Sequence, residues 1–134
     1  MRDAIERMEL VSDTYLSVST PVQVAAPALI AGGAAVRAQI QARIRANHAA
    51  LEQAAASHPS VDVLPVEGGW CAVLRVPSTW SEEDLVLDLL RERGVLVHPG
   101  YFFDFHHEAF LVLSLLAEPA VFAEGVTRVL EHVD

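Results

Sequence analysis

The chain has 134 residues, of which 52% are hydrophobic, so it has room for one compact domain with a substantial core and is not a disordered chain. Its formal charge of −9 provides no basic surface for nucleic acid and disfavours contact with acidic lipids. It has a single cysteine, no signal-peptide pattern and no apolar run that could cross a bilayer, so we expect a cytoplasmic protein with no nucleic-acid or membrane partner and no internal disulfide.

The N-terminal segment is predicted to be a helix followed by a loop. In residues 1–11, Ile5, Met8 and Val11 are spaced three apart on one face. No Ser, Thr, Asp or Asn precedes this helix, and we therefore expect the chain to have been cut from a longer one. Residues 12–20, rich in hydroxyl and β-branched side chains, predict an extended loop.

A second helical region follows this loop. Thr20 should be its N-cap and Pro21 its first residue. Pro27 and the Gly32-Gly33 pair should interrupt it, after which a longer helix should run to about His58-Pro59. The apolar stripe of that longer helix consists of Val36, Ile40, Ile44, Leu51 and Ala55.

The second half of the chain contains the predicted strands. The runs 61–66 and 70–77 are joined by Glu67-Gly68-Gly69, which is typical of an antiparallel hairpin. Two further strands are expected at residues 94–99 and 109–116.

Two helices accompany these strands. Ser81 should cap the first, with Asp84 at the capping-box position and Gly94 as its C-terminal stop, and the last should begin at Pro119. The order of the elements predicts a single domain of the α+β class, in which a small, mostly antiparallel sheet packs against helices and a long connector helix lies at the N-terminus.

Several metal-ligating side chains lie between the last two strands. His98, His106, His107 and Glu108 have the residue types of a metal site. Neighbouring residues of a strand point to opposite faces, however, and neither HExxH nor CxxC spacing is present. We therefore interpret the histidines as solvated loop residues and predict no metal.

No catalytic residue is predicted elsewhere. All nine positive residues are arginine, and without a lysine the chain has no ε-amine for Schiff-base chemistry. Cys71 in mid-strand is expected to be a buried, unreactive thiol, and Ser114 lacks the glycines of a nucleophile elbow. Trp70 and Trp80 are expected to be core or domain-contact residues.

An aromatic loop is the remaining candidate. Pro99-Gly100 turns the backbone sharply after a strand, and the following rings are too many for an ordinary polar connection. These rings are Tyr101, Phe102, Phe103 and Phe105. Such a loop covers a ligand, a partner domain or the protein's own core, and periodicity does not choose among the three.

The segment GVLVHPGYFF, followed by the strand FLVLSLLAEP and the helix VFAEGVTRVLEHV, resembles the C-terminal part of class I/II pyridoxal-phosphate-dependent aminotransferases of fold type I. In that family the phrase is G-V-x-V-x-P-G-x-x-F, then a strand ending in R-L-S-F, then a terminal helix containing E-G. GGWCAVLRVP is similar to the family's Gly-Gly-aromatic strand, and DTYLSVSTPVQVAAPALI to the segment after the cofactor lysine. The resemblance covers nearly the whole chain in order and spacing.

The resemblance implies a domain organisation and a reaction. Residues 1–58 would be connector and inter-domain helices, and residues 59–134 the C-terminal small domain. The parent enzyme would move an amino group between an amino acid and a 2-oxo acid with pyridoxal phosphate, and would be a homodimer. The Schiff-base lysine would belong to the large domain, so the isolated chain is expected to have no catalytic residue, no bound pyridoxal phosphate and no activity.

The resemblance also implies roles for two groups of residues. A small-domain loop would close over the substrate and exclude water, and it consists of Pro99, Gly100, Tyr101, Phe102 and Phe103. A second group would lie near the cofactor phosphate or the neighbouring subunit's site, and it consists of Tyr15, Ser17, Ser19 and Thr20. For Ser19-Thr20-Pro21 a helix cap alone is the competing interpretation.

One position departs from the family pattern. The family strand carries an arginine that binds the substrate α-carboxylate, and Val112 stands there in this chain. Either Arg75 or a large-domain arginine supplies the charge, or the substrate is not an ordinary α-amino acid. The alternatives to an enzyme are the aminotransferase-like effector domain of a GntR-type transcription regulator, or a stand-alone interaction module without a cofactor.

Overall fold

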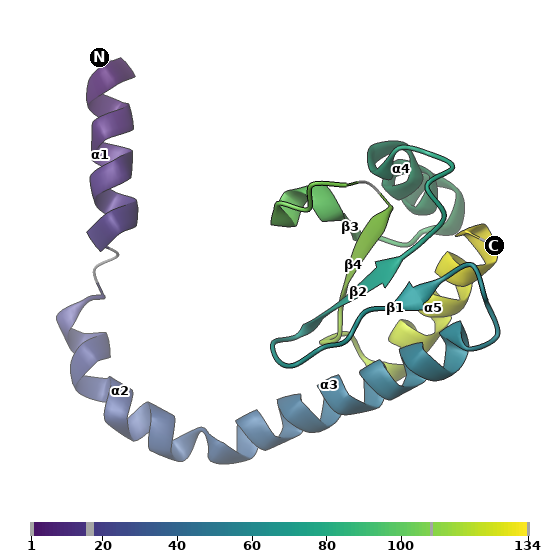
Figure 1. Cartoon of the computed structure of the whole chain (residues 1–134). Helices are drawn as coiled ribbons and strands as arrows, with labels where there is room; N and C mark the ends of the chain where they lie inside the picture. The colour runs from purple at the N-terminus through teal and green to yellow at the C-terminus, as the bar shows by residue number, and fades with distance from the viewer. Residues whose placement is uncertain (1, 16–17, 108, 134) are drawn as a thin grey trace. The chain divides into compact units, whose positions relative to one another are not determined.

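The computed structural model describes residues 2–15, 18–107 and 109–133 (Figure 1). Over these residues the chain forms five α-helices, a short 3-10 helix and a four-stranded sheet. It divides into two compact units, Met1–Arg37 and Ala38–Asp134. The α+β class predicted from the sequence is confirmed.

The first unit contains α1 (Arg2–Tyr15) and α2 (Thr20–Gly32). The predicted first helix is confirmed, but the loop predicted from residue 12 is wrong for its first four residues, which continue α1. The Thr14 hydroxyl donates to the Leu10 carbonyl at 2.7 Å, so this hydroxyl is satisfied inside the helix instead of favouring a turn.

Helix α2 begins one residue earlier than predicted and passes through its proline. Ser19, not Thr20, is the N-cap, and its side chain makes no capping hydrogen bond. The predicted interruption at Pro27 is wrong, because a proline removes a single backbone donor and α2 tolerates that loss. The interruption at Gly32-Gly33 is confirmed, and α3 (Ala34–Ala55) starts directly after it.

The sheet of the second unit has the strand order β1-β2-β4-β3, with every neighbouring pair antiparallel. Its strands are β1 (Asp62–Val63), β2 (Cys71–Arg75), β3 (His98–Pro99) and β4 (Phe110–Ser114). The predicted hairpin between β1 and β2 is confirmed, but β1 and β3 are shorter than expected. Pro65, which cannot donate to the sheet, follows closely after β1, whereas β3 ends at Pro99 as predicted and lacks the expected residues 94–97 at its start.

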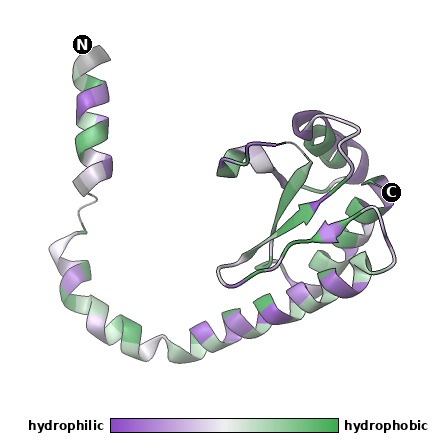
Figure 2. Cartoon of the chain, viewed as in Figure 1, coloured by the Kyte–Doolittle hydropathy of each residue, from purple (hydrophilic) through white to green (hydrophobic). Residues whose placement is uncertain are grey.

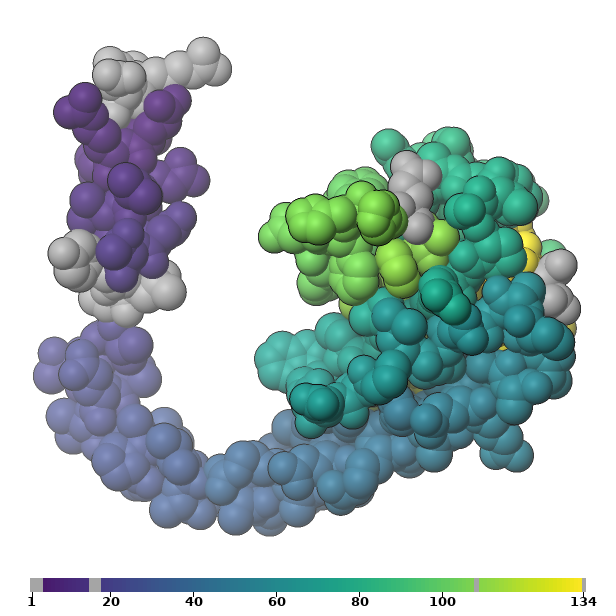
Figure 3. Space-filling view, viewed as in Figure 1, coloured from purple at the N-terminus to yellow at the C-terminus, as the bar shows by residue number. Residues whose placement is uncertain are grey.

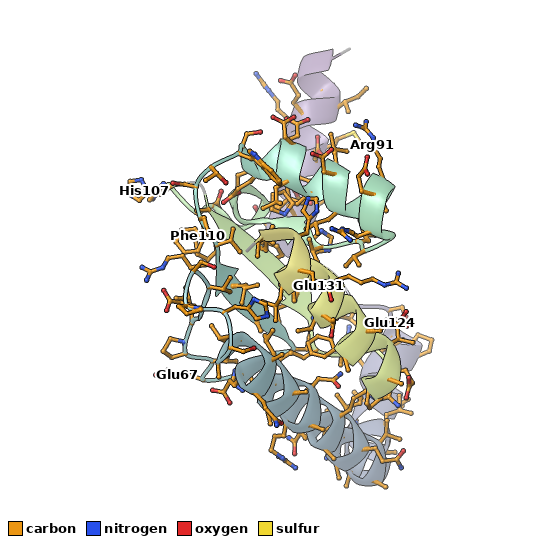
Figure 4. The ribbon with its side chains drawn as sticks, turned by 90° about the vertical axis from the view of Figure 1, so that its right-hand side faces the viewer. Glu67, Arg91, His107, Phe110, Glu124 and Glu131 are labelled. Atoms are coloured by element: carbon orange, nitrogen blue, oxygen red, sulfur yellow. The ribbon has the colours of Figure 1, made fainter. Side chains whose placement is uncertain are left out.

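Two helices flank the strands, α4 (Glu82–Arg93) and α5 (Pro119–Val133). The predicted cap of α4 is confirmed, since Ser81 Oγ accepts from the Asp84 amide at 3.2 Å. Gly94 ends the helix in the left-handed conformation, with φ of 64°, as predicted. On α5, Glu124 and Glu131 are exposed and point away from the sheet (Figure 4).

One face of the sheet packs against helices and forms the core. From the strands it takes Leu74, Leu111 and Leu113, and Figure 2 shows β2 and β4 as mainly hydrophobic. The helices contribute Leu51, Leu85, Leu89, Phe122, Val126, Val129 and Leu130. The stripe predicted on α3 is buried at Leu51 and Ala55, whereas Val36 and Ile40 are 58% and 42% exposed.

Candidate functional site

The polar side chains of the strands lie on the face of the sheet opposite the core. Successive residues of a strand alternate between the two faces, so the neighbours of the core residues Leu74, Leu111 and Leu113 point away from the helices. The strand register places them in three rows across the sheet: Asp62–Arg75–Phe110, Val73–Val112–His98, and Cys71–Ser114. We call this surface the open face.

A short 3-10 helix, η1 (Gly100–Phe103), rises directly from the edge strand β3. Tyr101, Phe102 and Phe103 are 49%, 63% and 49% exposed, so these rings do not cover the chain's own core. The His98 ring lies 6.0 Å from the Phe102 ring and 6.1 Å from the Phe103 ring, between centroids. This light green segment projects from the second unit (Figure 3), and it borders the open face at His98.

Both ends of the aromatic loop are held by one buried carboxylate. Glu82, the first residue of α4, is 2% exposed. Its Oε2 accepts from the Tyr101 amide at 3.1 Å and its Oε1 from the Phe110 amide at 2.8 Å. No local pattern in the sequence distinguishes this residue from its neighbours. Three acids follow Ser81, and all three suit the first turn of a helix equally well.

The predicted substrate-binding residues form one continuous segment of the structure. Pro99 and Gly100 are buried, and the three aromatic side chains after them are exposed. An added Cβ on Gly100 would lie 2.9 Å from Phe110 Cβ and 3.0 Å from Glu82 Oε1, so only glycine fits this turn. The loop is therefore tightly packed at its base and open at its tip.

The predicted cofactor residues belong to the first unit. Ser19 and Thr20 are exposed at the start of α2. The Tyr15 side chain and Ser17 lie outside the described residues. Because Ser19 makes no capping hydrogen bond, its hydroxyl is not committed to the helix.

One expectation about a single residue is wrong. Cys71 is not a fully buried mid-strand thiol: it is the first residue of β2 and is half-buried. Of the two roles expected for Trp70 and Trp80, a place in this chain's core is excluded because they are 59% and 48% exposed, and a contact with another domain stays a prediction. The Trp80 ring instead packs against His132, with 5.3 Å between ring centroids.

The histidines of the loop are placed on its surface. His106 and His107 are exposed, as expected for solvated residues, and Glu108 lies outside the described residues. Within the part of the chain that the structure describes, no group of three or more His, Cys, Asp or Glu side chains is arranged to hold a metal ion.

The charged group closest in register to Val112 on the open face is Arg75. Val112 is 3% exposed and pairs with Val73, two residues before Arg75 on β2. Arg75 Nε donates to Asp62 Oδ2 at 3.1 Å, and Nη2 donates to the same oxygen. Its side chain remains 57% exposed despite this ion pair.

Comparison with known proteins gives a fold likeness but no sequence match. No family model and no curated protein matches the sequence. The structure is similar to LysN, an α-aminoadipate aminotransferase from Thermus thermophilus, with a TM-score of 0.70 and 22% identity over 99% of this chain and 36% of that chain. It is also similar to YbdL from Escherichia coli, identified as a methionine aminotransferase, with a TM-score of 0.68 and 19% identity over 90% of this chain and 32% of that chain.

A third similar structure is a pyridoxal-phosphate-dependent aminotransferase from Streptococcus suis, with a TM-score of 0.64 and 22% identity over 72% of this chain and 26% of that chain. The chain thus spans about a third, or less, of the length of these proteins. What this chain shares with these proteins is the fold of one part of an aminotransferase.

Among the described residues, none of the helices is both long and apolar enough to cross a membrane.

Proposed function

We propose that this chain is the C-terminal small domain, with its connector helices, of a class I/II pyridoxal-phosphate-dependent aminotransferase of fold type I. The fold likeness to aminotransferases supports this, together with the sequence GVLVHPGYFF, which falls on β3 and η1. The observation that carries the proposal is the exposed aromatic 3-10 helix beside an open sheet face that bears Arg75 and His98. Rings and polar groups of this kind line ligand sites.

The composition of α2 supports the role of residues 1–58 as connector and inter-domain helices. Helix α2 contains no charged residue, and none of its residues is buried. A helix that is apolar all round is normally covered by other protein. In the proposed parent, the large domain and the second subunit of a cytoplasmic homodimer would cover it.

Pyridoxal phosphate would supply the electron sink for amino-group transfer in the parent. This chain contains no lysine, so its residues do not fit covalent attachment of that group, which would belong to the large domain. Ser19 and Thr20 offer hydroxyls at the N-terminus of α2, a position that favours a phosphate, and Tyr15 and Ser17 precede them. We propose that these four residues approach the cofactor phosphate.

The aromatic loop would close over an amino acid or a 2-oxo acid. Its tip, from Tyr101 to Phe103, is exposed and apolar, so closing it over a bound substrate would exclude water from the reacting atoms. Pro99 and Gly100 form the buried base from which the tip projects.

The proposal is tested by comparing the 134-residue chain with the full-length protein encoded by its gene. Added pyridoxal phosphate should give the chain no dialysis-resistant absorbance band near the visible edge and no transamination, because there is no lysine to attach it. The full-length protein should show both, and replacing its cofactor lysine with alanine should remove both. A stable band on the 134-residue chain, or a winged-helix DNA-binding segment at the N-terminus of the full-length protein, would contradict the proposal.

Arg75 is the residue we propose to bind the substrate carboxylate in place of an arginine at Val112. It lies on the same face, about 7 Å along the strand from the Val73–Val112 pair, which an arginine side chain can reach. In the full-length enzyme, Arg75→Gln should raise KM for the amino acid about tenfold or more, because a charge-assisted hydrogen bond is lost. Arg91→Gln, an exposed arginine on α4, is the control. An unchanged KM in Arg75→Gln would assign the carboxylate to an arginine outside this chain.

A further inference from the structure

Glu82 is buried where its neighbour is not. Glu82 and Glu83 occupy the first turn of α4, yet Glu83 is exposed and Glu82 is 2% exposed. An acid that only favoured the start of a helix would remain in water, because burying a carboxylate is costly unless it is well hydrogen-bonded. The burial of Glu82 therefore requires a further explanation.

The hydrogen bonds of Glu82 connect two points that are far apart in the sequence. Tyr101 starts the exposed tip of the aromatic loop, and Phe110, labelled in Figure 4, starts β4. One carboxylate oxygen accepts from each amide, at 3.1 and 2.8 Å. Glu82 thus closes the segment between Tyr101 and Phe110 into a loop whose two ends are fixed to α4.

The close packing around Gly100 leaves room for this carboxylate because residue 100 has no side chain. A Cβ at position 100 would lie 3.0 Å from Glu82 Oε1, 2.9 Å from Phe110 Cβ and 3.3 Å from Phe105 Cβ. The glycine therefore allows the carboxylate to approach both amides. Past the tip, Asp104 adopts a left-handed conformation with φ of 58°, and Ala109 has φ of 88°. Both conformations are unfavourable for these residues and persist only where other contacts hold the loop.

Without the Glu82 carboxylate, the aromatic loop would be held less firmly in the conformation that keeps its rings exposed. Tyr101, Phe102 and Phe103 are each about half exposed or more, and the apolar Val73 on the adjacent open face is half-buried. Freed rings would be driven by the hydrophobic effect to fold onto such a surface. Glu82 opposes this by fixing the backbone on both sides of the tip.

We infer that Glu82 is a positioning residue for substrate binding, because it holds the aromatic loop in the conformation that receives the substrate. The inference rests on the proposed function and extends it to a residue that touches neither substrate nor cofactor. If only a fraction of the molecules has the loop in the conformation that binds substrate, the apparent affinity for substrate is reduced by that fraction.

The test compares Glu82→Gln with Glu83→Gln, which removes the same charge from the same helical turn. Glutamine at 82 keeps one acceptor but turns an NH₂ donor toward a peptide N–H. In the 134-residue chain, the amides of Tyr101 and Phe110 should exchange about tenfold faster or more in Glu82→Gln, since a hydrogen bond to a charged group is lost. Chymotrypsin should also cut faster after the exposed rings. Glu83→Gln should match the wild type in both measurements.

The functional part uses the full-length enzyme. Glu82→Gln should raise KM for the amino acid about tenfold, while cofactor retention on dialysis stays that of Glu83→Gln. If the amides of Tyr101 and Phe110 exchange at the wild-type rate in Glu82→Gln, the inference is overturned. Faster exchange with an unchanged KM would also overturn it, because Glu82 would then have a structural role only. A wild-type enzyme without transamination would overturn the proposed function, and the inference with it, before any substitution is made.

Discussion

Replacing Asn47 with leucine should lower the free energy of unfolding by about 2–4 kcal/mol. Asn47 lies on α3 and is 1% exposed. Its Nδ2 donates to the carbonyl oxygens of Leu115, at 3.0 Å, and Ala117, at 2.9 Å. These carbonyls follow β4, where the chain turns toward α5, so the amide ties α3 to that turn. Leucine would leave both acceptors without their donor in a place that water reaches poorly.

Urea unfolding followed by circular dichroism measures this change. Gln53→Leu is the matched control, because it also replaces an amide with leucine on α3 but at an exposed position. Its effect should stay within about 0.5 kcal/mol. If Asn47→Leu is as stable as Gln53→Leu, the two hydrogen bonds of Asn47 contribute nothing to the stability of the fold.

The parts of the fold with local signals were predictable. Ser81 and Gly94 mark the ends of α4 through a cap and a left-handed glycine, both of which act within a few residues. Pro27 was misleading, because a proline weakens a helix without determining whether its neighbours continue it. Asn47 was missed for another reason. It sits on the apolar stripe of α3, between Ile44 and Leu51, and its partners are nearly seventy residues away.

The residues of the candidate site likewise differ in whether a local sequence pattern reveals them. The aromatic loop was found from its composition, since Pro99-Gly100 and the rings after it are visible in the sequence. Glu82 was not found, because only the packed structure distinguishes it from Glu83. The ion pair between Arg75 and Asp62 likewise depends on the register of β1 and β2. Contacts that join distant segments leave no local pattern.

The largest single effect is expected in the middle of β4. Leu111 is fully buried and belongs to the core that the sheet shares with the helices. Leu111→Ala should lower the free energy of unfolding by about 3–4 kcal/mol, because it removes buried methyl groups and leaves a cavity. Leu96→Ala is the control, since Leu96 is 71% exposed and should change stability by less than about 0.5 kcal/mol. Equal stability of the two variants in urea would show that this face of β4 is not the core.

Leu111 and Val112 are adjacent in the chain but lie on opposite faces of the sheet, and this separates stability from ligand binding. Leu111→Ala should lower the unfolding free energy while KM of the folded full-length enzyme stays unchanged, because its side chain points into the core. Arg75→Gln, on the open face, should do the reverse, since its exposed side chain contributes little to stability. If both variants changed the same quantity, the two faces of this sheet would not have the separate roles that the alternation of its side chains predicts.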